Sequence, residues 1–160
     1  MSAITIRRAE TADNALVTDF ALALTQEIMA RTGTPHFDID RVGIEALCAR
    51  YLESGIYSVL LAQAGHATVG FATLCESHAL YVGGAFGIVQ EFYVEPAWRS
   101  RSVGRALLDG ARREAGRRGW LRLELCTPPL PEFDRTLAFY AENGFEITGG
   151  RKMKCPVGPG

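Results

Sequence analysis

The sequence predicts an α/β (α+β) fold, in which helices flank both faces of a mixed, mostly antiparallel sheet. Three observations lead to this prediction. Some segments alternate apolar and polar residues or are apolar throughout, which is typical of strands. Others place apolar residues every three or four positions, which is typical of amphipathic helices. Their order is β-α-α-β-β-β-α-β-α-β, which favours antiparallel pairing first and two right-handed crossovers between parallel neighbours later.

The first half of the chain accounts for the antiparallel part of this sheet. Its predicted elements are a strand at 3–8, a helix begun by Thr11 or Asp13, a second helix at 38–54, and a hairpin at 57–75 that turns at Gly65-His66. The stretch RTGTPHF separates the two helices, because glycine and proline interrupt the helical pattern.

The second half begins with a strand that is apolar on both faces, as expected for the centre of a sheet. Its predicted elements are this strand at 85–95, a helix from about Val103, a strand at 120–126, a short helix at 135–143, and a last strand or hairpin at 145–155. We therefore expect one domain over residues 1–155, followed by a flexible tail at 156–160.

Composition narrows the class of protein. The chain has 160 residues with 17 basic and 18 acidic side chains, so its bulk charge suggests neither a nucleic acid nor an anionic membrane as partner. No apolar run approaches the roughly 20 residues that span a bilayer, and the start of the chain lacks a signal peptide's apolar core. A cytoplasmic location is expected. The 4 cysteines and 3 histidines lack the spacing of a metal site, so we expect reduced thiols and no metal.

The stretch from Trp98 to Gly119, WRSRSVGRALLDGARREAGRRG, joins a loop rich in arginine, serine and glycine directly to an amphipathic helix. The first N–H groups of a helix have no intrahelical acceptor and lie at the positive end of the helix dipole, so this junction suits an anion. Ser102 and Gly104 are small enough for close approach, and nearby arginines suit phosphate. The spacing excludes a P-loop and a dinucleotide-binding fingerprint. A capped helix with a solvated basic face is the alternative.

Two motifs resemble the GNAT superfamily of N-acetyltransferases. The segment QEFYVEPAWRSRSVGRALLDGARREAGRRGWLRLEL, residues 90–125, is similar to that family's core, in which a strand ending like Y-V-x-P-x-x-R precedes Q/R-x-x-G-x-G/A at a helix start. Arg99, Ser102 and Gly104 fall on the defined positions, with serine in place of the first glycine. The segment FYAENGFEITGG, residues 139–150, resembles the family's later F-Y-x-x-x-G-F element.

The resemblance implies acetyl-CoA, or another acyl-CoA, as donor. Backbone groups of Phe92, Tyr93 and Val94 would pair with the pantetheine arm, and the loop and helix start would hold the pyrophosphate. The residues implied for the pyrophosphate are Arg99, Ser100, Arg101, Ser102, Val103, Gly104, Arg105 and Ala106.

Direct attack of an amine on the thioester requires a base, an oxyanion donor and a proton for the leaving thiolate. Tyr140 matches the family tyrosine that often serves as general acid; the alternative is that its ring only packs in the interior. The resemblance implies that a backbone N–H near Val94 would donate to the oxyanion. Glu91 is the candidate base, with a salt bridge to a neighbouring arginine as the alternative. The weaker candidates are Glu124 and Glu76 as bases and Cys126 as a nucleophile.

Two departures from the family pattern bear on the donor site. Ser102 is unfavourable if its position requires a positive φ, and tolerable if it is merely close to phosphate. Phe133 stands where many members carry an asparagine that contacts the cofactor.

The acceptor is expected to be a small-molecule or peptide amine. The loops expected to line its entrance carry His36, Phe37, Asp38, Asp40, His78, Tyr81 and Glu132. Three functions are compatible with the sequence: an N-acyltransferase, an acetyl-CoA-binding module without turnover, and a scaffold that has lost its cofactor. A homodimer is a further expectation, with the last strand as a contact edge.

Overall fold

Five strands form one sheet in the order β1-β2-β3-β4-β5, in a computed structural model that describes residues 3–158. β1 to β4 pair antiparallel in sequence order, and β5 pairs parallel with β4. The strands are β1 (Ile4–Arg8), β2 (Tyr57–Ala64), β3 (Ala67–Ala79), β4 (Gly84–Val94) and β5 (Leu123–Leu125). The predicted mixed, mostly antiparallel sheet is confirmed, as is the hairpin that turns at Gly65-His66.

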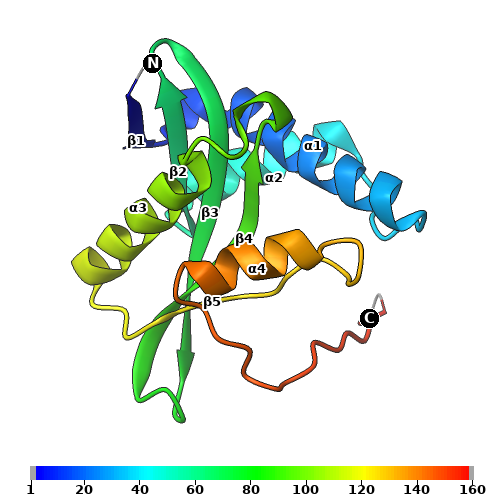
Figure 1. The fold of residues 1–160 in the computed structure, drawn as a ribbon, viewed down its shortest axis with the longest axis vertical. Helices are drawn as coiled ribbons and strands as arrows, with labels where there is room; N and C mark the ends of the chain where they lie inside the picture. The colour runs from blue at the N-terminus through cyan, green and yellow to red at the C-terminus, as the bar shows by residue number, and fades with distance from the viewer. Residues whose placement is uncertain (1–2, 159–160) are drawn as a thin grey trace. The chain divides into compact units, whose positions relative to one another are not determined.

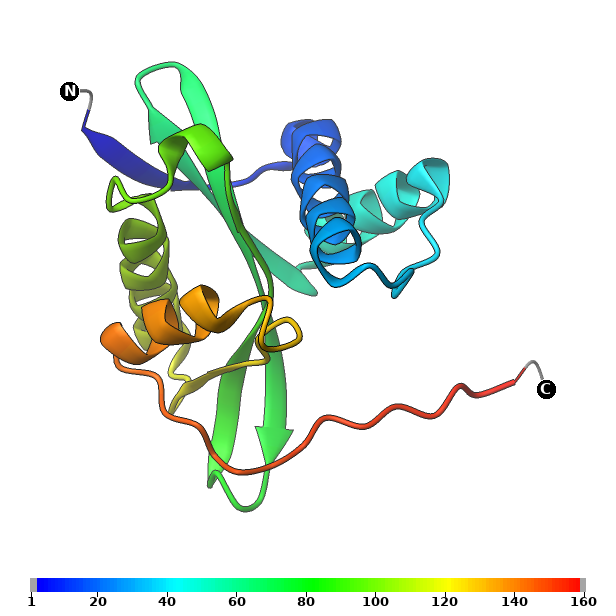
Figure 2. The same ribbon diagram turned by 45° about the vertical axis from the view of Figure 1, so that its right-hand side comes forward.

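Helices cover both faces of this sheet, as predicted. α1 (Asn14–Thr32) and α2 (Arg41–Ser54) lie on one face, and α3 (Val103–Arg118) lies on the other (Figures 1 and 2). Two short 3₁₀ helices, η1 (Thr11–Asp13) and η2 (Pro96–Trp98), precede α1 and α3. None of the helices within residues 3–158 is long and apolar enough to cross a membrane.

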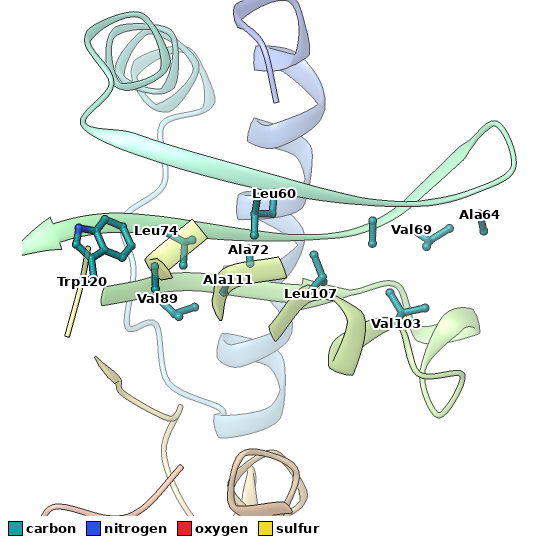
Figure 3. Packing of buried hydrophobic residues seen from close by; sticks show 12 residues of the cluster. Leu60, Ala64, Val69, Ala72, Leu74, Val89, Val103, Leu107, Ala111 and Trp120 are labelled. Atoms are coloured by element: carbon teal, nitrogen blue, oxygen red, sulfur yellow. The ribbon is translucent and has the colours of Figure 1, made fainter. Parts of the chain in front are cut away.

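The larger hydrophobic core lies between the sheet and α3. Val103, Leu107 and Ala111 recur at helical spacing along the buried face of α3. They belong to one cluster with side chains of β2, β3 and β4, among them Ala72 and Val89 (Figure 3). This packing holds α3 against the sheet and places its first turn near the end of β4.

Trp120 fixes the other end of α3. Gly119 takes a left-handed φ of 71°, and the Trp120 N–H donates to the Ala115 carbonyl at 2.9 Å, which closes the helix. The indole then packs so closely on Gly87 of β4 that any Cβ there would overlap the ring, and its Nε1 donates to Glu76 at 2.6 Å. This contact sets where β5 joins β4.

A second core lies between the sheet and the α1–α2 pair. The ring of Phe20 from α1 stacks on Phe71 of β3 at a centroid distance of 5.5 Å and contacts Tyr93 of β4 at 6.0 Å. Val17 of α1 and Leu61 of β2 complete this cluster. The contacts hold α1 across the middle strands of the sheet.

α1 and α2 differ in how their N-terminal ends are capped. Asp13 precedes α1, but its carboxylate binds the Arg7 guanidinium at 2.7 and 2.8 Å and accepts the Glu10 N–H instead of capping that helix. Asp40 caps α2, because its carboxylate accepts the N–H groups of Val42 and Gly43. Val42, in the first turn of α2, is 78% exposed, although the spacing of Val42, Ala46 and Tyr51 predicts that they share an apolar face.

The chain divides into two compact units, residues 1–125 and 126–160, and the sheet lies in the first. The second contains α4 (Asp134–Glu142), the predicted short helix. The predicted single domain over 1–155 stays a prediction. Of the predicted tail at 156–160, residues 159–160 lie outside the described residues.

The last strand or hairpin predicted at 145–155 is wrong, because these residues form neither helix nor strand. The segment contains two adjacent glycines, of which Gly149 takes a φ of 84°, and three basic residues follow within five positions. Glycine weakens a strand interior, and charged residues bury little apolar area, so the alternating pattern does not suffice. The exposure of Ile147, at 78%, agrees with this.

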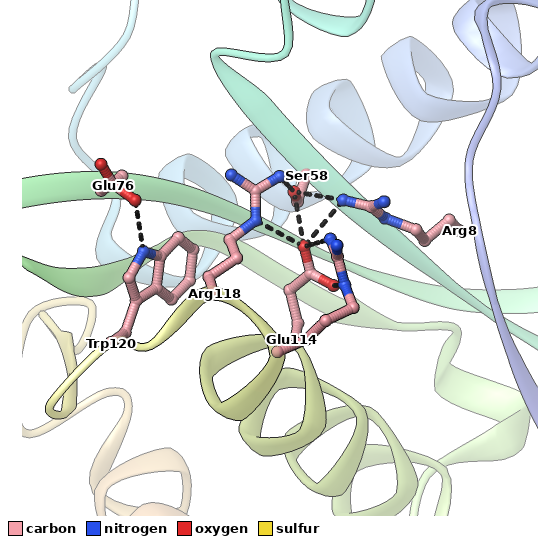
Figure 4. A network of polar contacts seen from close by, with 7 residues as sticks. Arg8, Ser58, Glu76, Glu114, Arg118 and Trp120 are labelled. Atoms are coloured by element: carbon pink, nitrogen blue, oxygen red, sulfur yellow. Dashed lines mark hydrogen bonds and ion pairs between the residues drawn. The ribbon is translucent and has the colours of Figure 1, made fainter.

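A buried carboxylate ties α3 to the first two strands (Figure 4). Glu114 accepts hydrogen bonds from Ser58 at 3.0 Å and from Arg8 and Arg118 at 2.7 Å, and Arg117 binds it at 2.8 Å. Burial alone would raise the pKa of Glu114, but hydrogen bonds from Arg117, Arg118 and Ser58 and the charge of Arg8 lower it to about 2. The ionised carboxylate is therefore part of the folded structure.

Replacing Glu114 with glutamine tests this network. A carboxyl whose pKa is about 2 when folded and about 4.5 when unfolded stabilises the fold above the unfolded value and loses that contribution as the pH falls. We expect E114Q to lower the free energy of unfolding by about 2–4 kcal/mol at neutral pH. It should also flatten the loss of stability between about pH 5 and pH 2, measured by urea denaturation.

The matched control is Asp109→Asn on the same helix, whose carboxylate makes an exposed i,i+3 pair with Arg112. Such pairs contribute about 0–1 kcal/mol. If the free energy of unfolding falls equally between about pH 5 and pH 2 in wild type and in E114Q, the lowered pKa of Glu114 does not stabilise the fold.

Candidate active site at the edge of β4

The candidate site is built on β4, because the two edges of this strand have different neighbours. β3 pairs with β4 along its length, from Gly84 to Val94. β5 pairs only with Gly87, Ile88 and Val89. Within residues 3–158, no strand pairs with the outer edge of β4 beyond Val89. Residues 90–94 thus have a strand neighbour on one side only.

Backbone groups along this segment alternate between β3 and the outer edge. The Glu95 N–H donates to the Val69 carbonyl of β3 at 2.9 Å, so the groups of Phe92 and Val94 face the outer edge. Arg99 Nε donates to the Val94 carbonyl there at 2.9 Å. Of the three residues predicted to pair with pantetheine, two therefore direct their backbone outward.

A β-bulge interrupts the pairing of β4 with β3. Thr73 pairs with Glu91, whereas Leu74 pairs with Val89, so Gln90 is an extra residue in β4. A bulge changes the face onto which the following side chains point. Val89 belongs to the core under α3, while Glu91 points to the face covered by α1 and α2.

Glu91 is bound by two hydroxyl groups on that face. Tyr57 of β2 donates to Oε1 at 3.2 Å, and Thr73 of β3 donates to Oε2. The Thr73 hydroxyl also accepts the Glu91 N–H at 3.0 Å. Burial raises the pKa of Glu91, and the hydrogen bonds from Thr73 and Tyr57 oppose this effect.

The alternative of a salt bridge between Glu91 and an arginine is not what the structure shows. Among the described residues, the ion pairs of the arginines involve other carboxylates. The pKa of this partly buried carboxylate, which is held by neutral donors and no cation, is raised by desolvation above its ordinary value.

The loop before α3 leaves the start of that helix open. Ser100 and Ser102 take positive φ values of 59° and 64°, and Ser102 precedes α3 without a side-chain cap. The first helical bond runs from the Ala106 N–H to the Ser102 carbonyl at 3.0 Å. The N–H groups of Val103, Gly104 and Arg105 thus have no acceptor within the helix. The Ser102 position does require the left-handed conformation that glycine adopts more readily.

The predicted phosphate-binding arginines point in different directions. Arg99 binds Glu27 of α1 at 2.7 Å and lies over the Tyr93 ring, so its guanidinium is directed toward α1. Arg101 lies over the Trp98 ring at 5.3 Å, and Arg105 is exposed on the first turn of α3. Arg101 and Arg105 therefore flank the open helix start, whereas Arg99 fixes the end of β4.

Tyr140 lies on α4 in the second unit. Its ring contacts Phe139 at 5.3 Å and Phe145 at 5.7 Å, and its carbonyl accepts the Phe145 N–H. Burial raises the pKa of Tyr140, so its phenol is protonated throughout the neutral range. Phe133, which replaces the family asparagine, precedes α4 and is buried.

Glu76 and Glu124, the weaker candidates for the general base, bind other side chains. Glu76 accepts the Trp120 indole N–H and lies 3.3 Å from His78, and Glu124 binds Arg122 at 2.9 Å. Cys126 is exposed. Within residues 3–158, no group of three His, Cys, Asp or Glu side chains could hold a metal ion.

The predicted acceptor loops of the first unit lie apart. His36, Phe37 and Asp38 are exposed on the connection between α1 and α2. Tyr81 lies at the tip of the β3–β4 hairpin, where Arg122 stacks on its ring at 5.4 Å. Figures 1 and 2 both place this tip away from the α1–α2 connection. The structure therefore does not bring these two loops together.

Tyr57 and Thr73 were missed by sequence reasoning. Tyr57 begins a buried strand and Thr73 sits in an apolar run, and each type is common in strands. Tyr57 and Thr73 contact Glu91 because of the pairing register of β2, β3 and β4 and the bulge in β4. No local sequence pattern encodes that register.

A family comparison agrees with this geometry. The profile of the acetyltransferase (GNAT) domain matches residues 55–147. The sequence matches no curated protein.

Solved structures share the fold at low identity. Aminoglycoside N-acetyltransferase AAC(6')-Iy in complex with CoA superposes with a TM-score of 0.78 at 19% identity, covering 98% of this chain and 96% of that chain. Ribosomal-protein-alanine N-acetyltransferase from Brucella melitensis biovar Abortus 2308 gives 0.72 at 20% identity, covering 96% and 99%. Aminoglycoside acetyltransferase meta-AAC0020, from an uncultured soil metagenomic sample and in complex with sisomicin, gives 0.67 at 15% identity, covering 98% and 95%.

Substitutions at Ser102 test the strain in the loop. A left-handed residue that is not glycine costs about 1–2 kcal/mol, and glycine recovers this at an entropic cost of about 0.5–1 kcal/mol. We expect Ser102→Gly to leave the free energy of unfolding unchanged or raise it by up to about 1 kcal/mol in urea denaturation. Ser102→Val should lower it by about 1–3 kcal/mol, because a β-branched side chain is strained at positive φ. Equal stability of the two variants would show that this φ carries no strain.

Proposed function

Because the chain belongs to the GNAT acetyltransferase family, we propose that it is an acyl-CoA-dependent N-acyltransferase that transfers acetyl from acetyl-CoA to a primary amine. Donor and acceptor bind together, and the amine attacks the thioester directly. The observation that carries the proposal is the continuity between the outer edge of β4 and the open start of α3. The outer edge of β4 can pair with the amides of a pantetheine arm. A few residues later, the N–H groups at the start of α3 can bind a pyrophosphate.

The residues present fit a CoA-type donor. The outward backbone groups of Phe92 and the outward N–H of Val94 can pair with the pantetheine amides, while the Val94 carbonyl accepts from Arg99 Nε. The N–H groups at 103–105 converge at the positive end of the α3 dipole, and anion–dipole terms of about 0.3–1 kcal/mol each require several such donors. Arg101 and Arg105 add charge beside them.

The residues of this chain supply the proton transfers. Glu91 takes one proton from the acceptor ammonium, directly or through water, and leaves a neutral amine. As the new N–C bond forms, a backbone N–H near Val94 donates to the carbonyl oxygen that gains negative charge. The C–S bond then breaks, the Tyr140 phenol gives its proton to the leaving thiolate, and the second proton lost by the amine nitrogen returns to the phenolate through water, so that a neutral amide, a free thiol and the protonated phenol remain.

Burial of Glu91 fixes the sign of the expected pH dependence. A base works in its ionised form, so activity rises as the pH passes the pKa of Glu91. Because burial raises this pKa, the acid limb lies at higher pH than it would for a solvent-exposed glutamate.

The acceptor is proposed to be a small-molecule or peptide amine. Two of the structural neighbours are aminoglycoside acetyltransferases, and another is a ribosomal-protein-alanine N-acetyltransferase. The shared fold thus serves acceptors of both kinds. A cytoplasmic location and a homodimer stay predictions.

Donor binding is tested by calorimetry with acetyl-CoA and with longer acyl-CoAs. We expect saturable binding that Arg101→Ala/Arg105→Ala weakens at least about tenfold, because two charge-assisted contacts to phosphate are lost. Arg112→Ala, an exposed change later in the same helix, should bind as wild type does. No binding of any acyl-CoA would contradict the proposed function and leave a scaffold that has lost its cofactor.

Catalysis is tested by thiol release with a panel of amines. We expect Glu91→Gln to lower kcat about 10²–10⁴-fold, as for loss of a general base, with unchanged affinity for acetyl-CoA. Tyr140→Phe should lower kcat as well, by about 10²-fold or more. Tight acetyl-CoA binding without transfer to any amine, and unaffected by Tyr140→Phe, would instead indicate a module that senses acetyl-CoA.

A further inference from the structure

We propose that Tyr57 and Thr73 are positioning residues that hold the Glu91 carboxylate in one orientation and favour its ionised form. The inference rests on the proposed function, because it concerns the residue assigned there as general base. Neither hydroxyl is required to touch the acceptor or the thioester, since each acts through Glu91.

Thr73 orients Glu91 through both its backbone and its side chain. The two residues are a cross-strand pair next to the bulge at Gln90. The Thr73 oxygen accepts the Glu91 N–H at 3.0 Å, so its single proton is directed to Glu91 Oε2. The hydroxyl is fully buried, with Thr73 1% exposed, and water does not compete for this proton.

Tyr57 binds the other oxygen of the same carboxylate. Its hydroxyl donates to Oε1 at 3.2 Å from the first residue of β2. The Tyr57 ring is held against Tyr51 of α2 at a centroid distance of 5.0 Å. Burial and the charge of Glu91 raise the pKa of Tyr57, so the phenol keeps its proton and remains a donor.

The surroundings of Glu91 offer no cation to replace these donors. The titratable groups around the cluster are Cys48, Glu45 and Tyr51 of α2 and Cys75 of β3, and burial is the main cause that raises the pKa of the Cys48 thiol. α1 contributes Thr18, which does not titrate. Among the described residues, the two hydroxyls are thus the groups that offset the cost of burying the carboxylate.

Removing either donor destabilises the ionised form of Glu91 relative to the protonated form. The acid limb of the pH–rate profile should then move to higher pH, while the rate at alkaline pH, where Glu91 is ionised again, is kept. A purely structural role for these hydroxyls would lower the rate by the same factor at every pH.

The experiment compares Tyr57→Phe and Thr73→Val with wild type. We expect kcat/KM to fall about tenfold on the acid limb of the wild-type profile and to recover to within about twofold on the alkaline plateau. Thr73→Ser keeps the hydroxyl and should restore the wild-type profile. Thr5→Val, an exposed change on β1, is the matched control for loss of a threonine hydroxyl.

A second readout does not depend on activity. The Glu91 carboxyl carbon is titrated by ¹³C NMR and assigned by its absence in Glu91→Gln. We expect its titration midpoint to lie at higher pH in both Tyr57→Phe and Thr73→Val than in wild type.

The outcomes separate this inference from the function on which it rests. If Glu91→Gln keeps the wild-type acid limb, Glu91 is not the base, and the proposed mechanism fails. If Glu91→Gln abolishes the limb but Tyr57→Phe and Thr73→Val both titrate as wild type, the positioning role is overturned while the function stands. Should Thr73→Val not fold, Tyr57→Phe alone decides, because it removes one oxygen from a half-buried ring.

Discussion

The unequal pairing of β4 is the constraint on which the rest of the site depends. β3 holds this strand along its length, whereas β5 pairs with three of its residues. Trp120 sets where this pairing begins, because its indole packs on Gly87 and anchors the chain as it leaves α3, and the pairing stops at Val89 because β5 ends at Leu125. Among residues 3–158, the edge of β4 beyond Val89 is therefore not paired with another strand, and it leads toward the start of α3.

Glu114 is buried and Glu91 is partly buried, and the comparison shows how surroundings change the behaviour of the same residue type. Glu114 lies among three guanidinium groups, its pKa falls to about 2, and it ties α3 to β1 and β2. Glu91 has only the hydroxyls of Tyr57 and Thr73, and burial raises its pKa. The first arrangement keeps a fixed charge that stabilises the fold, and the second leaves a carboxylate with a raised pKa, which we propose as the general base.

Much of the fold could be predicted from the local pattern of apolar and polar residues. The features that could not be predicted depend on the register in which the strands pair. The strands, the helices on both faces and the open start of α3 are predictable, because periodicity and loop composition encode them. The bulge at Gln90 and the partners of Glu91 depend on three strands coming together. Arg99 was expected at the phosphates, yet Glu27 lies 72 positions away in sequence and binds it in space. The segment at 145–155 alternates as a strand does, but its glycines and basic residues bury too little apolar area.

The most direct test of the account is amide hydrogen exchange with and without acetyl-CoA. The central claim is that backbone groups of β4 and α3, more than side chains, hold the donor. The account predicts that bound acetyl-CoA slows exchange at Phe92, Val94 and residues 103–105, while the β2–β3 hairpin turn at Gly65-His66 is unchanged. Saturating acetyl-CoA that leaves exchange at these backbone positions unaltered would contradict it.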